Sequence, residues 1–114
     1  MLFRSTDAGT LLTQFQGWWN NNPPAATRDV TMLFTGRAIN GNVIGLAYVG
    51  QICNVGAAYG LTETMFAGTA TNITSRVGLL SHEMGHLWNA QHCDGSADCR
   101  IMCSGLGEIG RAHV

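Results

Sequence analysis

The sequence contains no lysine, and charged residues of either sign are scarce. All six basic residues are arginine, seven residues are acidic, and charged residues make up 11% of the 114-residue chain. An average soluble protein carries roughly 25%. The formal net charge is -1. This balance argues against binding to nucleic acid or to an anionic membrane, because both need a clustered basic face.

Long apolar runs are also absent. No stretch approaches the roughly 20 apolar residues of a bilayer-spanning helix, and residues 1–14 have neither a basic start nor a continuous apolar run. We therefore expect neither a membrane segment nor a signal peptide in this chain. Disorder is not expected either, because 46% of the residues are hydrophobic. The length suits one domain.

Cysteine is present at four positions, three of them between residues 93 and 103: Cys53, Cys93, Cys99 and Cys103. So many in a short chain indicate either a metal site or disulfides. The even count and the absence of a CxxC pair favour disulfides, and with them an oxidising, extracellular compartment.

The hydrophobic pattern predicts one helix and then three strands before residue 70. The helix is expected over residues 10–20 and the strands over residues 29–34, 43–49 and 61–66. The triplet Asn40-Gly41-Asn42 predicts a turn. Gly45 and Ala47 in the second strand would let another backbone lie close beside it.

Residues 74–103 are the most informative segment. A Thr or Ser is expected to cap a helix there, with one apolar stripe made by Val77, Leu80, Met84 and Leu87.

The same helix carries a metal-binding pattern. His82 and His86 are four residues apart, so both imidazoles leave one face and can hold a single cation. Glu83 lies where its carboxylate can reach water at that cation without being a ligand. This is the HExxH arrangement that zinc hydrolases require. The alternative is an accidental match, with the two histidines a solvated helical pair.

A third histidine follows at a spacing that a continuous helix could not use. His92 comes six residues after His86, which on an uninterrupted helix would place it away from the shared face. Asparagine tolerates the left-handed conformation that commonly ends helices. We therefore predict that Asn89 ends the helix and turns the chain back, so that His92 reaches the same cation.

These residues resemble a known family. The string from His82 to His92, HEMGHLWNAQH, resembles the elongated zinc signature of the metzincins, HExxHxxGxxH, with Asn89 where that clan usually has glycine. Ile101 and Met102 resemble the clan's Met-turn. Residues 33–36 and 45–53 resemble strands of the adamalysin (reprolysin, ADAM-type) branch, and the resemblance covers roughly residues 11–107.

The resemblance implies an α+β (mixed α/β) fold, the zincin-like catalytic domain of the metzincins. Such a domain has a twisted, mainly parallel sheet with one antiparallel edge strand, an active-site helix and a Met-turn. Family members have further elements before and after the matched region, so we expect residues 1–107 to be a catalytic domain truncated at both ends. Residues 108–114 are interpreted as a non-native tail, because a common short-read sequencing adapter encodes the same residues.

Carried over to this chain, the resemblance implies that His82, His86 and His92 bind one catalytic zinc ion (Zn2+) and leave a fourth position for water. Glu83 would be the general base that activates this water. Met102 would pack beneath the three histidines. The implied activity is that of a zinc metalloendopeptidase, secreted in its full-length form.

The resemblance also implies where a protein or peptide substrate would bind. The strand at residues 43–49 would be the exposed edge on which an extended substrate lies, held by main-chain hydrogen bonds around Gly45, Leu46 and Ala47. A plain edge strand is the alternative. Ser104 and Gly105 would line the pocket for the residue that follows the cleaved bond. The sequence makes no prediction of the oligomeric state.

The cysteine-rich segment departs from the family pattern. Cys93 directly follows the third histidine, where the adamalysin branch commonly has Asp, and Asp94 comes one residue later. A buried role for Asp94 is therefore in question. Cys93 could be interpreted as a fourth zinc ligand, but adjacent side chains rarely converge on one ion. We expect Cys93 to pair with Cys99 and Cys53 to pair with Cys103.

Two other classes fit the sequence. A non-catalytic binding module stabilised by zinc would keep the histidines but have little use for Glu83. A fragment that cannot fold alone would carry the motif of its parent peptidase without showing its activity.

Overall fold

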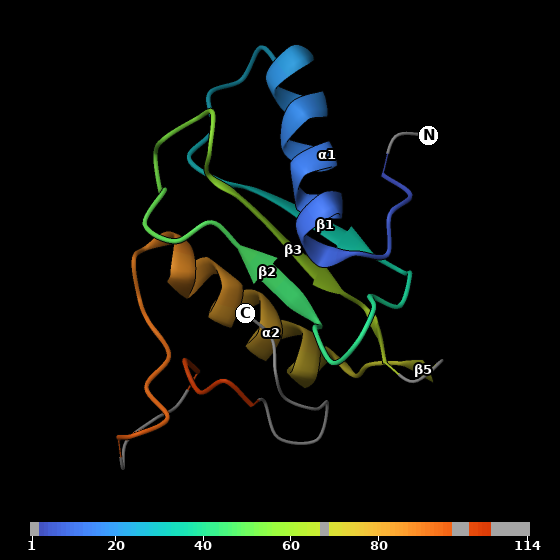
Figure 1. The fold of residues 1–114 in the computed structure, drawn as a ribbon. Coiled ribbons are helices and arrows are strands. Elements are labelled where there is room, and N and C mark those ends of the chain that lie inside the picture. The colour runs from blue at the N-terminus through green and yellow to red at the C-terminus, as the bar shows by residue number, and fades with distance from the viewer. Residues whose placement is uncertain (1–2, 67–68, 97–100, 106–114) are drawn as a thin grey trace.

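The computed structural model describes residues 3–66, 69–96 and 101–105 (Figure 1). These residues form two helices and five short strands, which confirms the mixed α/β class. In chain order the elements are α1 (Ala8–Asn21), β1 (Thr31–Thr35), β2 (Gly45–Ala47), β3 (Tyr59–Glu63), β4 (Met65–Phe66), β5 (Thr69–Ala70) and α2 (Ile73–Leu87).

The main sheet has three strands in the order β1-β3-β2. β1 runs parallel to β3, with Leu33 opposite Leu61, and β2 runs antiparallel to β3, with Leu46 opposite Leu61. The described sheet thus has the expected antiparallel edge strand, but with one parallel and one antiparallel pair it is mixed and not mainly parallel. β4 and β5 form a separate two-stranded hairpin.

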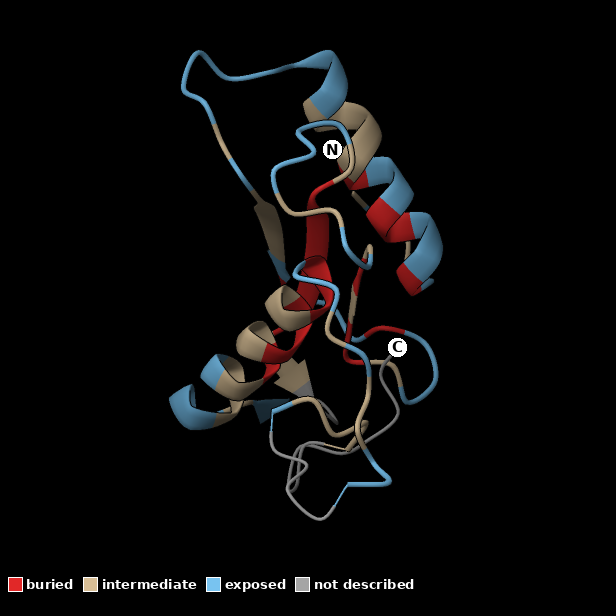
Figure 2. Cartoon of the chain, turned by 90° about the vertical axis from the view of Figure 1, so that its left-hand side faces the viewer, coloured by how far each residue is buried: buried red, intermediate tan, exposed pale blue. Residues whose placement is uncertain are grey.

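The central strand β3 is buried along its whole length because a helix covers each face of the sheet. Figure 2 shows α1 and α2 on opposite sides of this buried strand. Asp7 caps the N-terminus of α1, and its carboxylate accepts a hydrogen bond from the Thr10 amide at 2.9 Å. Its apolar face joins the main core, which comprises Ala8, Leu11, Leu12, Phe15, Ile39, Tyr59 and Leu61.

The expected element bounds need correction at the strands. The helix expected at residues 10–20 lies within α1, but the strand expected at 43–49 is regular only over Gly45–Ala47. Beyond this range single hydrogen bonds continue the contact, from the Glu63 amide to the Ile44 carbonyl and from the Tyr48 amide to the Tyr59 carbonyl. The strand expected at 61–66 begins earlier and is interrupted at Thr64, which separates β3 from β4.

The apolar stripe expected for α2 is wrong at three of its four positions, since only Leu87 is buried. Val77 is 55% exposed, and Leu80 and Met84 are only half-buried. The buried residues of this helix are Leu79, His82, Glu83, His86 and Leu87. The face toward the sheet is therefore the one that carries the metal-binding pattern.

The start of α2 also differs from the expectation. The N-cap is Asn72 and not a Thr or Ser, and its side chain accepts a hydrogen bond from the Ser75 amide at 2.8 Å. No helix within the described ranges is long and apolar enough to cross a bilayer.

Candidate metal centre

α2 ends in a turn that reverses the chain directly after the second histidine. Asn89 has a φ of 71°, and its amide donates to the His86 carbonyl while the Ala90 amide donates to the Gly85 carbonyl. This pair of hydrogen bonds around a left-handed residue is the Schellman motif. The motif ends the helix within one residue and directs residues 90–92 back toward the face that carries His82 and His86.

The loop after β2 completes the end of this helix. The Gly50 amide donates to the His86 carbonyl at 2.8 Å, and the Ile52 amide donates to the Leu87 carbonyl at 3.0 Å. The last carbonyls of a helix lack hydrogen-bond donors within the helix, and the amides of this loop provide such donors. Gly50 has a φ of 73°, and a Cβ there would lie 3.2 Å from Asn89 Oδ1. The two left-handed residues therefore pack side by side.

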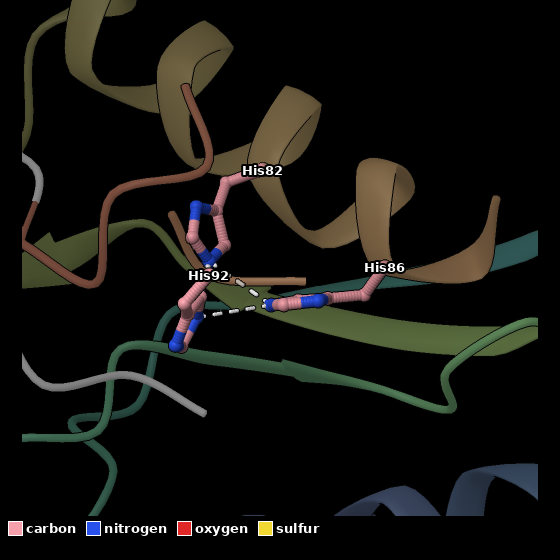
Figure 3. Close-up of side chains that lie close together, drawn as sticks. All are labelled: His82, His86 and His92. Atoms are coloured by element: carbon pink, nitrogen blue, oxygen red, sulfur yellow. Dashed lines mark hydrogen bonds between the residues drawn. The ribbon is translucent and has the colours of Figure 1, made fainter. Parts of the chain in front are cut away.

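The three histidines converge on one point. The distances between their Nε2 atoms are 3.1 Å for His82–His86, 3.1 Å for His82–His92 and 3.2 Å for His86–His92. Figure 3 shows two of the rings extending from α2 and the third approaching from the loop that follows it. His82 and His86 are almost fully buried, at 0% and 4% exposure, and His92 is more exposed.

Backbone carbonyls determine which nitrogens carry protons. His82 Nδ1 lies 2.5 Å from the Ile101 carbonyl, and His86 Nδ1 lies 2.8 Å from the Ala90 carbonyl. Both Nδ1 atoms must donate to these oxygens, so in the neutral rings both Nε2 atoms present lone pairs. Two lone pairs 3.1 Å apart repel each other unless a cation lies between them.

The spacing of the nitrogens suits a tetrahedral ion. Ligand nitrogens about 2.0–2.1 Å from tetrahedral zinc lie roughly 3.3–3.4 Å apart, close to the measured 3.1–3.2 Å. No other group of three or more His, Cys, Asp or Glu side chains within the described ranges has this geometry. The three histidines can therefore hold a metal ion, and Cys93 is not part of the converging set.

Burial favours the neutral form of the two ligands on α2, His82 and His86. The pKa of His82 is lowered to about 4, mainly by burial and to a smaller extent by the neighbouring His86 and His92, although the hydrogen bond to the Ile101 carbonyl opposes this shift. Burial also lowers the pKa of His86. Metal ions bind the unprotonated imidazole, so near pH 7 these two rings are ready to bind without losing a proton.

Glu83 directly follows His82 on α2 and is fully buried, at 0% exposure. Neither of its carboxyl oxygens has a hydrogen-bond partner within the described residues. Burial raises its pKa to about 9, because removal from water disfavours the charged form. The carboxyl group lies against the backbone of Gly45 on β2.

The turn at Ile101 and Met102 contacts α2 next to the histidines. The Ile101 carbonyl holds His82, and the Met102 side chain packs on the backbone of Gly85, where a Cβ would lie 2.5 Å from its sulfur. The Met102 carbonyl accepts a hydrogen bond from the Cys93 amide at 3.1 Å. The turn thus contacts both the helix and the loop that carries the third histidine.

Asp94 has a role that the sequence did not indicate. Its Oδ1 accepts a hydrogen bond from the Ser104 amide at 2.8 Å, which connects the loop after His92 to the segment after the turn. Ser104 and Gly105 are half-buried.

The expected disulfide pairings are wrong. Cys53 and Cys93 both carry reduced thiols, so neither Cys53–Cys103 nor Cys93–Cys99 is formed. Cys53 is exposed at a φ of 63° in the loop after β2. Cys103 is disulfide-bonded, with neither of these two as its partner. Cys99 and the interpreted tail at residues 108–114 lie outside the described residues.

Most of the groups in the site that the sequence did not predict are main-chain groups. The carbonyls of Ala90 and Ile101 orient two of the rings, and the amides of Gly50 and Ile52 bind the last carbonyls of α2. A main-chain group carries no residue-type signal. Gly50 and Gly85 were detectable in principle, since an isolated glycine in a strand or helix pattern indicates a close approach by another group.

Comparisons with known proteins identify relatives of this chain. The chain is 31% identical over 98 residues to zinc metalloproteinase-disintegrin-like atrase-A of Naja atra, which covers 82% of this chain and 14% of the relative. It is 32% identical over 71 residues to zinc metalloproteinase recombinant fibrinogenase II of Deinagkistrodon acutus, covering 62% of this chain and 29% of the relative.

A third relative is disintegrin and metalloproteinase domain-containing protein 11 of Mus musculus. It is 31% identical over 81 residues, covering 71% of this chain and 10% of the relative. The chain therefore spans less than a third of the length of these curated relatives. A family model described as metallo-peptidase family M12 (Reprolysin_5) matches residues 3–109. The chain belongs to the reprolysin-type metallo-peptidase family M12.

Proposed function

We propose that the protein is a zinc-dependent metalloendopeptidase that hydrolyses peptide bonds in proteins or peptides. The observation that carries the proposal is the convergence of three histidine Nε2 atoms at 3.1–3.2 Å, with two of the rings held by backbone carbonyls. Membership of a metallo-peptidase family supports zinc as the ion.

His82, His86 and His92 would hold the Zn2+ ion through neutral Nε2 atoms. A zinc ion bound in this way lowers the pKa of water and polarises the carbonyl of the scissile bond. Glu83 would take a proton from the attacking water and pass it to the leaving amine. The carboxyl group accepts a proton only when it is ionised, and a cation held by the neighbouring histidines would favour the ionised form against the effect of burial.

The substrate is proposed to bind to β2 as an added strand. β2 pairs with β3 on one side, and within the described residues no strand pairs with its other side. An unpaired edge offers amides and carbonyls to an extended peptide, so Gly45, Leu46 and Ala47 would bind through their main chain. Ser104 and Gly105 would line the pocket for the residue that follows the cleaved bond.

The proposed location is outside the cell. This rests on the expectation from cysteine content and on the family, and the reduced thiols of Cys53 and Cys93 add no support to it. A protein or peptide substrate is the proposed partner.

The test is to measure zinc content and endopeptidase activity on one dialysed preparation. Wild type is compared with Glu83→Gln, and Glu63→Gln is the matched control because Glu63 is a second buried carboxyl, which accepts from the Ile39 amide. We expect one zinc per chain in all three proteins and chelator-sensitive cleavage in wild type and Glu63→Gln only. Zinc without cleavage in wild type would contradict the proposal and favour a zinc-stabilised binding module.

A further inference from the structure

The carboxyl group of Glu83 meets the edge strand at the one residue that has no side chain to obstruct it. A Cβ at Gly45 would lie 2.6 Å from Glu83 Oε2 and 3.0 Å from its Cδ and Cγ atoms. Non-bonded carbon atoms are in favourable contact at about 3.5–4.0 Å. Any side chain at this position would therefore displace the carboxyl group.

Both residues are buried in the interior. Glu83 has no exposed surface, and Gly45 is buried and paired with Thr62 in the sheet. Since no hydrogen bond within the described residues holds the Glu83 oxygens, packing alone determines where the carboxyl group lies. The Gly45 backbone is one wall of that packing.

We propose that Gly45 is a positioning residue for Glu83. The absent side chain lets the carboxyl group lie flat against β2, so the strand proposed to bind the substrate also sets the position of the proposed general base. The catalytic meaning of this contact rests on the proposed function. The contact itself can be tested without activity.

Gly60 provides a matched control on the neighbouring strand. A Cβ at Gly60 would lie 2.8 Å from the Met32 sulfur and 3.2 Å from the Ala47 Cβ, so Gly60→Ala strains the same sheet without touching Glu83. If Gly45 served only the packing of the sheet, the Tm penalties of Gly45→Ala and Gly60→Ala would both be independent of the Glu83 side chain. If Gly45 positions Glu83, only the Gly45→Ala penalty depends on that side chain.

The first measurement is a double-mutant cycle on thermal stability. Gly45→Ala and Gly60→Ala are each melted in the wild-type background and in a Glu83→Ala background, all without metal. Gly45→Ala is expected to lower the Tm of the wild type and to lower it much less when Glu83 is truncated, because the clashing atoms are gone. Gly60→Ala should lower the Tm equally in both. An equal Gly45→Ala penalty in both backgrounds would overturn the proposal.

The second measurement separates kcat from KM in the zinc-loaded protein. Alanine leaves the main-chain groups of β2 in place, so Gly45→Ala should change KM little while reducing kcat by about 100-fold, the order expected for a 1 Å misplacement. Zinc content should stay at one ion per chain. A raised KM with unchanged kcat would overturn the positioning role. If the wild type cleaves no substrate but the Tm penalty of Gly45→Ala still depends on the Glu83 side chain, the proposed function is refuted while the contact between Gly45 and Glu83 is supported.

Discussion

Replacing Asn89 by alanine should weaken both the fold and the metal site, whereas replacing it by glycine should not. Asn89 lies at a φ of 71°, a conformation that costs an ordinary side chain about 1–2 kcal/mol. Glycine has no such cost because it has no Cβ. The two variants remove the same amide group and differ by one methyl group, so their difference isolates the backbone term.

The size of the effect follows from this conformational cost. A loss of about 1–2 kcal/mol corresponds to a factor of roughly 5–30 in the ratio of folded to unfolded protein. For a domain near this size each kcal/mol shifts Tm by about 4–8 °C. We therefore expect Asn89→Ala to melt about 4–16 °C below Asn89→Gly.

The metal site should respond as well. The turn at Asn89 places the Ala90 carbonyl 2.8 Å from His86 Nδ1 and directs the chain toward His92. If alanine opens the turn, zinc affinity measured by competition with a chelator should be lower for Asn89→Ala than for Asn89→Gly. Equal melting temperatures and equal zinc affinities for the two variants would refute the reasoning.

Three further predictions concern the centre itself. His92→Ala should lose stoichiometric zinc after dialysis, measured by elemental analysis, because two imidazoles remain; retention of one zinc per chain would contradict the site. In the metal-free protein, burial raises the folded-state pKa of Glu83 to about 9 from 4.5, so unfolding releases a proton between these values and stability falls as pH rises through this window. Glu83→Gln removes this pH dependence. In denaturant titrations with chelator, the free energy of unfolding of Glu83→Gln relative to wild type should therefore grow by a few kcal/mol as pH rises through the window. A difference that does not change with pH would contradict the prediction. Gly85→Ala should lower Tm because its Cβ would meet the Met102 sulfur at 2.5 Å. Gly78→Ala on the same helix places its Cβ in open space and should raise stability by about 1 kcal/mol. Equal effects of the two substitutions on Tm would exclude the Met102 contact.

Spacing along the chain was sufficient to predict the elements that carry the site. The helical repeat places His82 and His86 on one face whatever surrounds them, and the structure brings His92 to the same point. The helix at residues 10–20 was predictable for the same reason, since its apolar residues recur at helical intervals. Such patterns depend on local geometry alone.

Features that depend on the surroundings were not predictable in this way. The stripe expected on α2 assumed that apolar side chains face inward, but the structure buries His82, Glu83 and His86 and leaves Val77 55% exposed. The disulfide pairings required distances that only the fold determines, and the expected pairs do not form. The edge strand is regular over only Gly45–Ala47 because strand ends are set by the partner and not by composition.

The loop after β2 has a consequence for how the molecule opens. The Gly50 and Ile52 amides bind the last carbonyls of α2, although they precede that helix in the chain by many residues. The hydrogen bonds of the final helical turn are therefore not all local, because two of its carbonyls have donors in this distant loop. Transient detachment of the loop and fraying of the helix at His86 would be one cooperative event. The proposed substrate strand and the metal ligands would then share a single local unfolding unit.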